Sequence, residues 1–321
     1  MTILFDLLGK LAKMTRRSLA SRVRALPDVS PSPGRTAPVP PAATQQKYVW
    51  QRLNPPGIAD FDASLYGANP RNDAVALLSF APRFALDVGC SSGGVARAVM
   101  AAYPQCRLWG IEPNATAAKL ARSRMDRVIG DTFETINWAE EGVGAGDIDT
   151  VFLLDVLEHM YNPWRTLETL RSLVNPQAQL VISLPNVRNM FLIRDLMNGY
   201  WHYRDAGLLD STHIRFFSEH EALRLIYQTG FRVERHSFPM CAGIAPHYEK
   251  FKDGPFPQRV EFEKGSLEIE NLAELQSFAA MQHMYLVRPV RRDELSAEEI
   301  ALIDGPHPQT FAMGADYAGT L

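Results

Sequence analysis

The residues best suited to chemistry lie in segment 84–94, which reads FALDVGCSSGG. This pattern predicts a short apolar strand, a glycine-rich turn and a helix that begins near Val95. Glycines at positions 89, 93 and 94 permit positive φ and carry no Cβ, so the backbone can approach a bound molecule closely. The amide groups at the start of the helix would face that molecule.

A loop of this kind can hold either a dinucleotide or S-adenosylmethionine. Read as G-x-G-x-x-G, the segment supplies Gly89, Ser91 and Gly94, and the missing middle glycine disfavours a dinucleotide. Asp87 ends the strand, where its carboxylate would repel a pyrophosphate and attract an ammonium or a sulfonium. The loop therefore favours the positively charged ligand, and a tight strand-to-helix turn without a ligand is the simpler alternative.

Three further apolar runs also end in an acid, at Glu112, Asp131 and Asp155. Glu112 follows the glycine loop by about 20 residues, the spacing at which a carboxylate meets ribose hydroxyls. Because the carboxyl ends of parallel strands share one edge of a sheet, we expect these acids and Asp87 to line one crevice. Any single acid could be merely solvated, so the prediction rests on the whole series.

The segments around these acids alternate between two types. Apolar runs begin near positions 84, 107, 127, 149 and 179, and helical stretches cover 95–103, 114–124 and 163–174. Such alternation predicts a parallel sheet with helices on both faces. Asn114 is a plausible cap for the second of these helices, and Ser218 for a later one.

Over about residues 66–236 the chain resembles the class I S-adenosylmethionine-dependent methyltransferases. The resemblance is carried by D-x-G-x-x-x-G, Glu112, the pair 130–131 and the run DVLEH at 155–159. It implies an α/β fold with a Rossmann-like, doubly wound seven-stranded sheet of order 3-2-1-4-5-7-6, the last strand antiparallel, and a cap inserted after strand five. It also implies S-adenosylmethionine as the cofactor, with Glu112 on the ribose and Asp131 on the adenine amino group. The cofactor contacts that it implies are Asp87, Gly89, Cys90, Gly93, Glu112, Pro113, Asp131, Thr132 and Asp155.

Residues 187–217 are dense in large side chains, and we interpret them as a cap over the substrate. Within them, the sequence GLLDSTHIRFFS at 207–218 is similar to a segment of methyltransferases associated with cell-envelope polysaccharide biosynthesis, and more loosely to the ubiquinone-type O-methyltransferases. Arg215 would bind an anionic group of the acceptor or pair with Asp210 to hold the cap. The expected acceptor contacts are Tyr66, Trp201, Tyr203, Asp210 and Arg215.

Methyl transfer from a sulfonium is a direct displacement, and a hydroxyl acceptor is helped by a general base. His213 is the favoured base and His159 the second candidate, because histidine titrates near neutral pH. A structural hydrogen bond is the alternative role for His213, and Asp155 is the third candidate catalytic residue. No H-x-x-x-H or C-x-x-C pair occurs, so we expect no metal.

The chain outside the sheet divides by composition. Residues 2–26 alternate leucines and basic residues in the pattern of an amphipathic helix, too short and too charged to span a bilayer. This helix would lie on an anionic membrane surface, on a partner protein or on its own domain. The predicted division is helix 1–26, proline-rich linker 27–44, methyltransferase domain 45–290 with the cap 187–217 and an insertion 239–278, and C-terminal extension 291–321.

Composition limits the function classes. The net charge of -3 gives no electrostatic footprint for nucleic acid. Three widely spaced cysteines fit a reducing cytoplasm. If residues 2–26 bind lipid, we expect the protein to associate with the inner face of the membrane. The leading hypothesis is O-methylation of a saccharide or small-molecule acceptor. The alternatives are N- or C-methylation, a nicotinamide-dependent oxidoreductase, and a non-catalytic scaffold that binds the cofactor.

Overall fold

The computed structural model describes residues 69–204 and 206–305. The predicted helix 1–26, the linker 27–44 and Tyr66 lie outside the described residues, as does the end of the C-terminal extension. Within the described part of the chain, the helices are all too short or too polar to cross a membrane.

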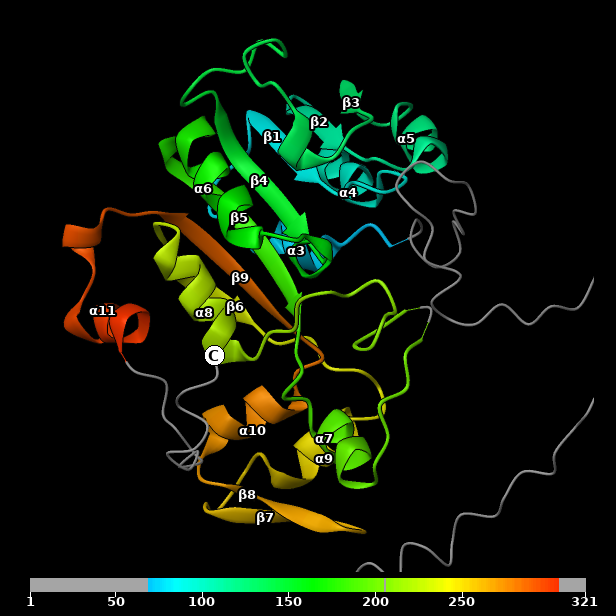
Figure 1. Ribbon diagram of the computed structural model, residues 1–321, viewed down its shortest axis with the longest axis vertical. Coiled ribbons are helices and arrows are strands. Elements are labelled where there is room, and N and C mark those ends of the chain that lie inside the picture. Colours follow the sequence, from blue (N-terminus) through cyan, green and yellow to red (C-terminus); the bar gives the residue numbers. More distant parts are fainter. Residues whose placement is uncertain (1–68, 205, 306–321) are drawn as a thin grey trace, which may run out of the picture. The chain divides into compact units, whose positions relative to one another are not determined.

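Seven strands form one sheet in the order β3-β2-β1-β4-β5-β9-β6 (Figure 1). β9 runs antiparallel between β5 and β6, and the neighbouring pairs from β3 to β5 are parallel. The doubly wound sheet and its strand order are therefore confirmed, with β9 as the seventh strand of the expected order. The strands are β1 (Phe84–Val88), β2 (Arg107–Ile111), β3 (Arg127–Ile129), β4 (Ile148–Leu154), β5 (Val174–Pro185), β6 (Phe231–Ser237) and β9 (Gln282–Pro289).

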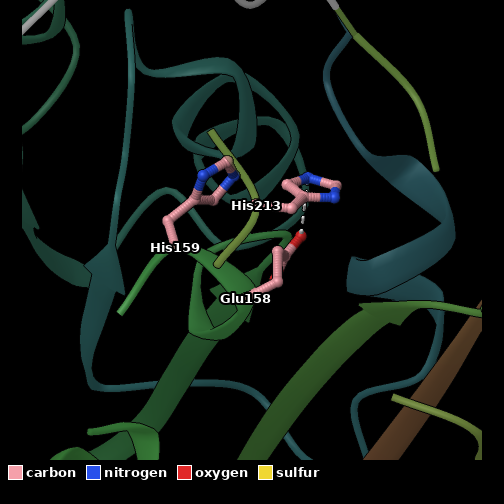
Figure 2. Close-up of side chains that lie close together, drawn as sticks. All are labelled: Glu158, His159 and His213. Atoms are coloured by element: carbon pink, nitrogen blue, oxygen red, sulfur yellow. Dashed lines mark ion pairs between the residues drawn. The ribbon is translucent and has the colours of Figure 1, made fainter. Parts of the chain in front are cut away.

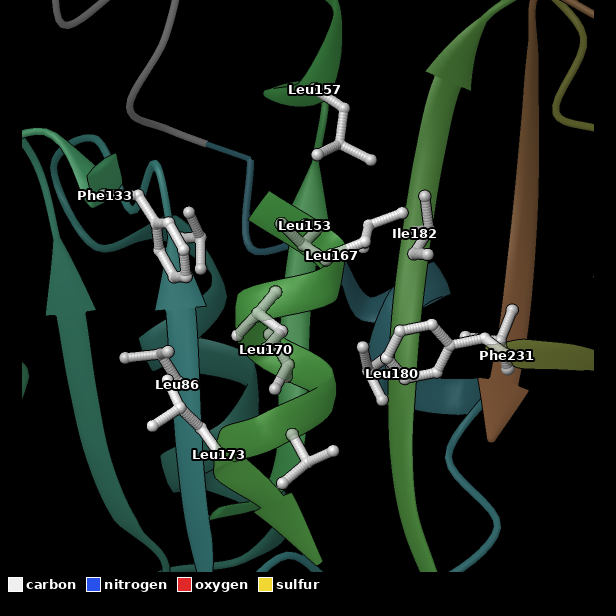
Figure 3. Packing of buried hydrophobic residues seen from close by; sticks show 14 of the residues in the cluster. Leu86, Phe133, Leu153, Leu157, Leu167, Leu170, Leu173, Leu180, Ile182 and Phe231 are labelled. Atoms are coloured by element: carbon white, nitrogen blue, oxygen red, sulfur yellow. The ribbon is translucent and has the colours of Figure 1, made fainter. Parts of the chain in front are cut away.

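Helices cover both faces of the sheet because alternate strand residues face opposite sides. Leu86 packs with residues of α6 (Pro163–Leu173) and α8 (Glu219–Gln228), as Figure 3 shows for Leu167 and Leu170 of α6. Its neighbour Ala85 instead packs with the second cluster. That cluster is formed with α3 (Asn72–Ala76), α4 (Gly94–Ala102) and α5 (Ala115–Ala121).

Side-chain caps fix where several of these helices begin. Asn114 Oδ1 accepts from the amides of Thr116 and Ala117 at the start of α5, and Ser218 Oγ accepts from the amide of Glu221 at the start of α8. Both caps were expected from the sequence. Each bond satisfies a backbone donor that has no partner within the helix.

A second layer of elements packs beside the carboxyl edge of β5. It contains α7 (Met190–Met197), α9 (Ala245–Phe251), the hairpin β7 (Gln258–Phe262) with β8 (Gly265–Ile269), and α10 (Leu272–Ala279), seen together in the lower part of Figure 1. We call these elements the lobe. Met190 of α7 belongs to the same buried cluster as Leu275 of α10. Part of the expected cap and most of the expected insertion are thus one structural unit.

The C-terminal helix α11 (Ala297–Asp304) packs against α8. The guanidinium of Arg232 in β6 binds both carboxylate oxygens of Glu299, at 2.9 and 2.7 Å. Such bidentate pairs have a defined geometry and hold the two elements in register.

Replacing Gly110 with alanine should destabilise the fold. A Cβ at this position in β2 would lie 2.5 Å from both Cys90 Sγ and Met125 Sδ, so buried neighbours must move. We expect Gly110→Ala to lower the free energy of unfolding by about 1–3 kcal/mol, measured by urea denaturation. Gly144→Ala is the control, because its added Cβ would approach nothing closer than 3.4 Å. Equal losses in the two variants would contradict the packing argument.

Candidate functional site

A cavity of about 390 Å³ opens at the carboxyl edge of the sheet. Its walls come from the loop after β1, the turn after β4, the cap residues 206–213 and the start of β9. β1 and β4 are neighbours in the sheet although β2 and β3 follow β1 in the chain and lie on its other side. Ligands of open α/β sheets bind at such a point, because the loops leave the two strands in opposite directions.

The glycine loop is shaped by close backbone contacts. The amides of Gly89 and Cys90 both donate to the carbonyl oxygen of Ile111, at 2.9 and 3.0 Å. A Cβ on Gly89 would lie 2.7 Å from Val156 Cγ2, and its φ of 73° also favours glycine. The loop therefore brings bare backbone to the cavity, where Gly89, Cys90 and Gly94 form part of the wall.

Glu112 fastens this loop to the end of β2. Its two carboxylate oxygens accept from the amides of Ser91 and Asn114, at 2.9 and 2.8 Å. Burial raises the pKa of Glu112, and the two amide bonds oppose that shift. A carboxylate has further lone pairs, so Glu112 can still accept from a ligand at the edge of the loop.

Asp87 is a buried acid with one oxygen that has no partner within the described residues. Its side chain lines the cavity and is only 2% exposed, and its Oδ2 has no hydrogen bond within the described residues. Burial, with a smaller contribution from the charge of Glu112, raises the pKa of Asp87 to about 7. An unpartnered buried carboxylate is costly, and a ligand ammonium would remove that cost. This arrangement fits a cationic ligand beside the glycine loop.

Asp155 has the opposite character, because its carboxylate is fully engaged. Oδ1 accepts from Ser183 Oγ and Gln282 Nε2, at 2.9 and 2.8 Å. Oδ2 accepts from Arg71 Nη1 at 2.8 Å. These contacts make Asp155 an anchor that joins three segments at the cavity wall.

Glu158, His159 and His213 converge at the cap side of the cavity (Figure 2). The turn after β4 carries the first two, and the cap carries His213. The two rings meet edge to face with centroids 4.8 Å apart, and His213 Nε2 lies 3.8 Å from Glu158 Oε1. Burial raises the pKa of Glu158 well above its ordinary value, and Asp155 adds to the shift.

Hydrogen-bond partners fix the proton on each of these imidazoles. The hydroxyl of Thr212 donates to Asp210 Oδ1 at 2.7 Å, so it accepts from His159 Nδ1 at 2.9 Å. His213 Nδ1 lies 3.2 Å from the carbonyl oxygen of Leu208, which can only accept. Both Nε2 atoms of the neutral rings therefore carry lone pairs. Burial lowers the pKa of both histidines, which favours the neutral form.

The other predicted site residues lie around or away from this cavity. Gly93 precedes α4, and Pro113, Asp131 and Thr132 follow β2 and β3 outside the cavity wall. Asp131 Oδ1 accepts from the amide of Thr132 and the hydroxyl of Thr135, and the Thr135 bond chiefly lowers its pKa.

On the cap, Asp210 lines the cavity and accepts from the amide of Thr212 at 2.8 Å. Trp201 and Tyr203 do not line the cavity, and Trp201 packs edge to face against Phe216. Arg215 also lies outside the wall, where it donates to the carbonyl oxygen of Tyr161 at 2.5 Å and covers that ring. The alternative pairing of Arg215 with Asp210 is not the contact that the structure shows.

Two residues of the site received no role from the sequence. Ser183 ends β5 and Gln282 begins β9, and both hold Asp155. The available signal was topological, since an antiparallel strand next to β5 must start at the carboxyl edge. Glu158 belongs to the run DVLEH that carries the family resemblance, and nothing local in the sequence shows that it is buried.

The chain is similar in sequence to known methyltransferases. A family model described as a methyltransferase domain matches residues 68–236, more than half of the chain. A curated relative, the trans-aconitate 2-methyltransferase of Rhodopseudomonas palustris, is 26% identical over 136 residues, which make up 40% of this chain and 52% of the relative. The chain thus spans about half the length of that relative.

Two solved structures have a similar fold. A SAM-dependent methyltransferase from Archaeoglobus fulgidus is 18% identical, with a TM-score of 0.45 over 64% of this chain and 86% of that one. A SAM-dependent methyltransferase from Thermotoga maritima is 15% identical, with a TM-score of 0.44 over 68% of this chain and 87% of that one.

Replacing Asp87 with asparagine should stabilise the ligand-free protein at alkaline pH. The folded state holds the Asp87 proton up to about pH 7, whereas the unfolded chain releases it near the ordinary value of 3.8, so this group lowers stability as pH rises between the two values. We expect Asp87→Asn to raise the melting temperature by a few degrees at pH 8 and to change it little at pH 4. Asp131→Asn is the control at an exposed acid, and a similar gain there would contradict the prediction.

Proposed function

Because the chain belongs to the methyltransferase domain family, we propose that it transfers the methyl group of S-adenosylmethionine to a hydroxyl of a small-molecule or saccharide acceptor. The observation that carries the proposal is the Asp87 carboxylate in the wall of the cavity, whose buried Oδ2 has no partner within the described residues, beside a glycine loop that exposes backbone. The carboxylate suits a ligand with a positive charge, and the exposed backbone lets that ligand approach the loop closely.

The residues present fit this cofactor. Asp87 would take its ammonium, and Gly89 and Cys90 would lie along its methionine part. Glu112 would accept from the ribose, and Asp131 and Thr132 stand at the strand end proposed for the adenine. When bound, the cofactor supplies a methyl group on a sulfonium, which is a good leaving group.

The acceptor is proposed to enter from the cap side. There the chain's contribution is to hold the acceptor oxygen in line and to take its proton, and such alignment alone supplies several kcal/mol in related reactions. His213 Nε2 is the proposed base, because its lone pair is free and burial keeps the ring neutral near pH 7 by lowering its pKa. His159 Nε2 is the second candidate for the same reason.

The charges of the wall favour an acceptor that is not an anion. Asp87, Asp155, Glu158 and Asp210 line the cavity, and among its described lining residues Arg71 is the one permanent cation. Arg71 pairs with Asp155 at 2.8 Å through Nη1, which leaves its buried Nη2 as the one cationic group of the wall without a partner in the described residues. A polyanion such as trans-aconitate would meet this wall unfavourably, so we propose a neutral hydroxyl compound. An amine is the second candidate, because the same lone pairs would accept from it.

Asp87→Asn should weaken cofactor binding. Loss of a charge-assisted hydrogen bond in a buried site costs about 1.5–3 kcal/mol, so we expect a rise in Kd of roughly tenfold or more for S-adenosylmethionine. Titration calorimetry on the full chain measures this, with S-adenosylhomocysteine and NAD as comparison ligands. Tight binding of NAD, or an unchanged Kd in the variant, would argue against the proposal.

Loss of the proposed base should slow turnover. With a labelled methyl donor and a panel of saccharide and small-hydroxyl acceptors, the labelled product identifies the substrate. With that substrate we expect His213→Ala to lower kcat by about 10²–10⁴, the usual contribution of a general base. His220→Ala, an exposed change on α8, is the control. Near wild-type turnover in both His213→Ala and His159→Ala would remove the base assignment.

A further inference from the structure

We propose that Glu158, His159 and His213 form a binding site for a divalent transition-metal ion at the cap side of the cavity. Each side chain offers one ligand atom, and these atoms lie within 4.8 Å of one another. Figure 2 shows the three side chains grouped around one space, with the carboxylate of Glu158 turned toward the His213 ring. Small side-chain rotations would bring them to the usual bond lengths of about 2.0–2.2 Å.

The two imidazole rings are held in the tautomer that metal binding requires. Metal-binding histidines usually donate their other ring N–H to a carbonyl, a carboxylate or a similar acceptor, which fixes the ring and the tautomer. His213 Nδ1 donates to the carbonyl of Leu208, and His159 Nδ1 donates to Thr212, whose hydroxyl continues to Asp210. Both Nε2 atoms are thereby left as metal ligands.

The Glu158 carboxylate is buried beside these rings. Its side chain is 1% exposed, and both oxygens are buried without a hydrogen-bond partner in the described residues. When Glu158 is ionised, the three ligand atoms of the cluster are all acceptors, and none donates to another. A cation satisfies a buried carboxylate and two lone pairs at once, whereas a hydrogen-bonded network would need a donor for each.

The backbone holds the three ligands in place before any ion binds. The amides of Ile214 and Arg215 both donate to the carbonyl oxygen of Glu158, at 3.0 Å each. These bonds tie the cap segment that carries His213 to the turn that carries Glu158 and His159. Preorganised ligands lose less conformational entropy when they coordinate an ion.

The ligand types indicate the class of ion. Two imidazoles and one carboxylate suit Zn²⁺, Fe²⁺ or Co²⁺ better than Mg²⁺ or Ca²⁺, which prefer oxygen ligands. Three protein ligands leave a coordination position open toward the cavity, where an acceptor oxygen could bind. That last role rests on the proposed function. An ion there would lower the pKa of a bound acceptor hydroxyl, whose proton would then pass to water, and the two imidazoles would act as ligands and not as the base.

A second cluster shows what distinguishes the site. Ligand atoms of Glu219, His236 and His283 also lie within 4.8 Å of one another. There, however, His236 Nε2 and His283 Nδ1 are 3.0 Å apart, so one ring donates to the lone pair of the other. The cluster does not line the cavity. It therefore provides a matched control for nonspecific metal binding by histidines.

Metal titration of the untagged full-length chain tests the proposal. After dialysis against a chelator and then buffer, Zn²⁺ is titrated by calorimetry and Co²⁺ by visible absorption, without methyl donor or acceptor. We expect one equivalent of each ion to bind in the wild type and in His236→Ala. His159→Ala and Glu158→Gln should each raise the Kd by at least about tenfold. Glu158→Gln keeps the shape of the side chain, so it serves if His159→Ala does not fold.

The outcomes separate this site from the proposed methyl transfer. No binding of Zn²⁺ or Co²⁺ by the wild type overturns the metal site, even if S-adenosylmethionine binds normally. Loss of binding in His236→Ala, with binding unchanged in Glu158→Gln, overturns it as well. Metal binding without binding of the methyl donor would keep the metal site and remove the proposed function.

Discussion

The carboxylate of Asp155 is the contact on which the geometry of the site depends. It binds Arg71 before β1, Ser183 in β5 and Gln282 at the start of β9. Its φ of 55° lies in the left-handed region, and the chain then enters the tight turn at Leu157–His159. The strain of that conformation is offset by the three side-chain bonds. The same turn delivers Glu158 and His159 to the cavity, so the contacts of Asp155 also help to fix the position of these two side chains.

The acids at the sheet edge divide into two groups with different work. Asp155 and Glu112 have partners, and they hold the turn after β4 and the glycine loop in position. Asp87 and Glu158 are more deeply buried than these two, and they have unpartnered oxygens within the described chain. The carboxylates with partners stabilise the loops of the site, whereas the unpartnered ones favour a ligand that is positively charged or that donates hydrogen bonds. One such carboxylate lies on the loop side of the cavity and the other on the cap side.

The cap depends on the backbone more than on its aromatic side chains. Two amides of the cap bind the carbonyl oxygen of Glu158, and Asn186 pairs with Phe217 across an isolated bridge. Trp201 and Tyr203 stay half-exposed and contact each other beside the cavity. The lobe packs beside this segment through α7, and α9, α10 and the β7–β8 hairpin all come after the residues that the family model matches. The cavity wall thus combines residues of the region that the family model matches with Met281 and Gln282 from the chain beyond it.

Local patterns were sufficient to predict the sheet, the glycine loop and the acids at the strand ends, because a strand face, a left-handed turn and a helix cap are encoded within a few residues. The burial of these side chains and their hydrogen-bond partners depend on segments far apart in the chain, so they are evident only in the folded structure. It gave Asp87 an unpartnered oxygen, engaged Asp155 through Gln282, and turned Arg215 away to Tyr161. It also brought His213 against Glu158 and His159. No short metal-binding spacing predicts this grouping, because the three residues lie on two separate segments of the chain. The physical reason is that strand order and the crossing of the cap fix these meetings, whereas local spacing records only neighbours along one element.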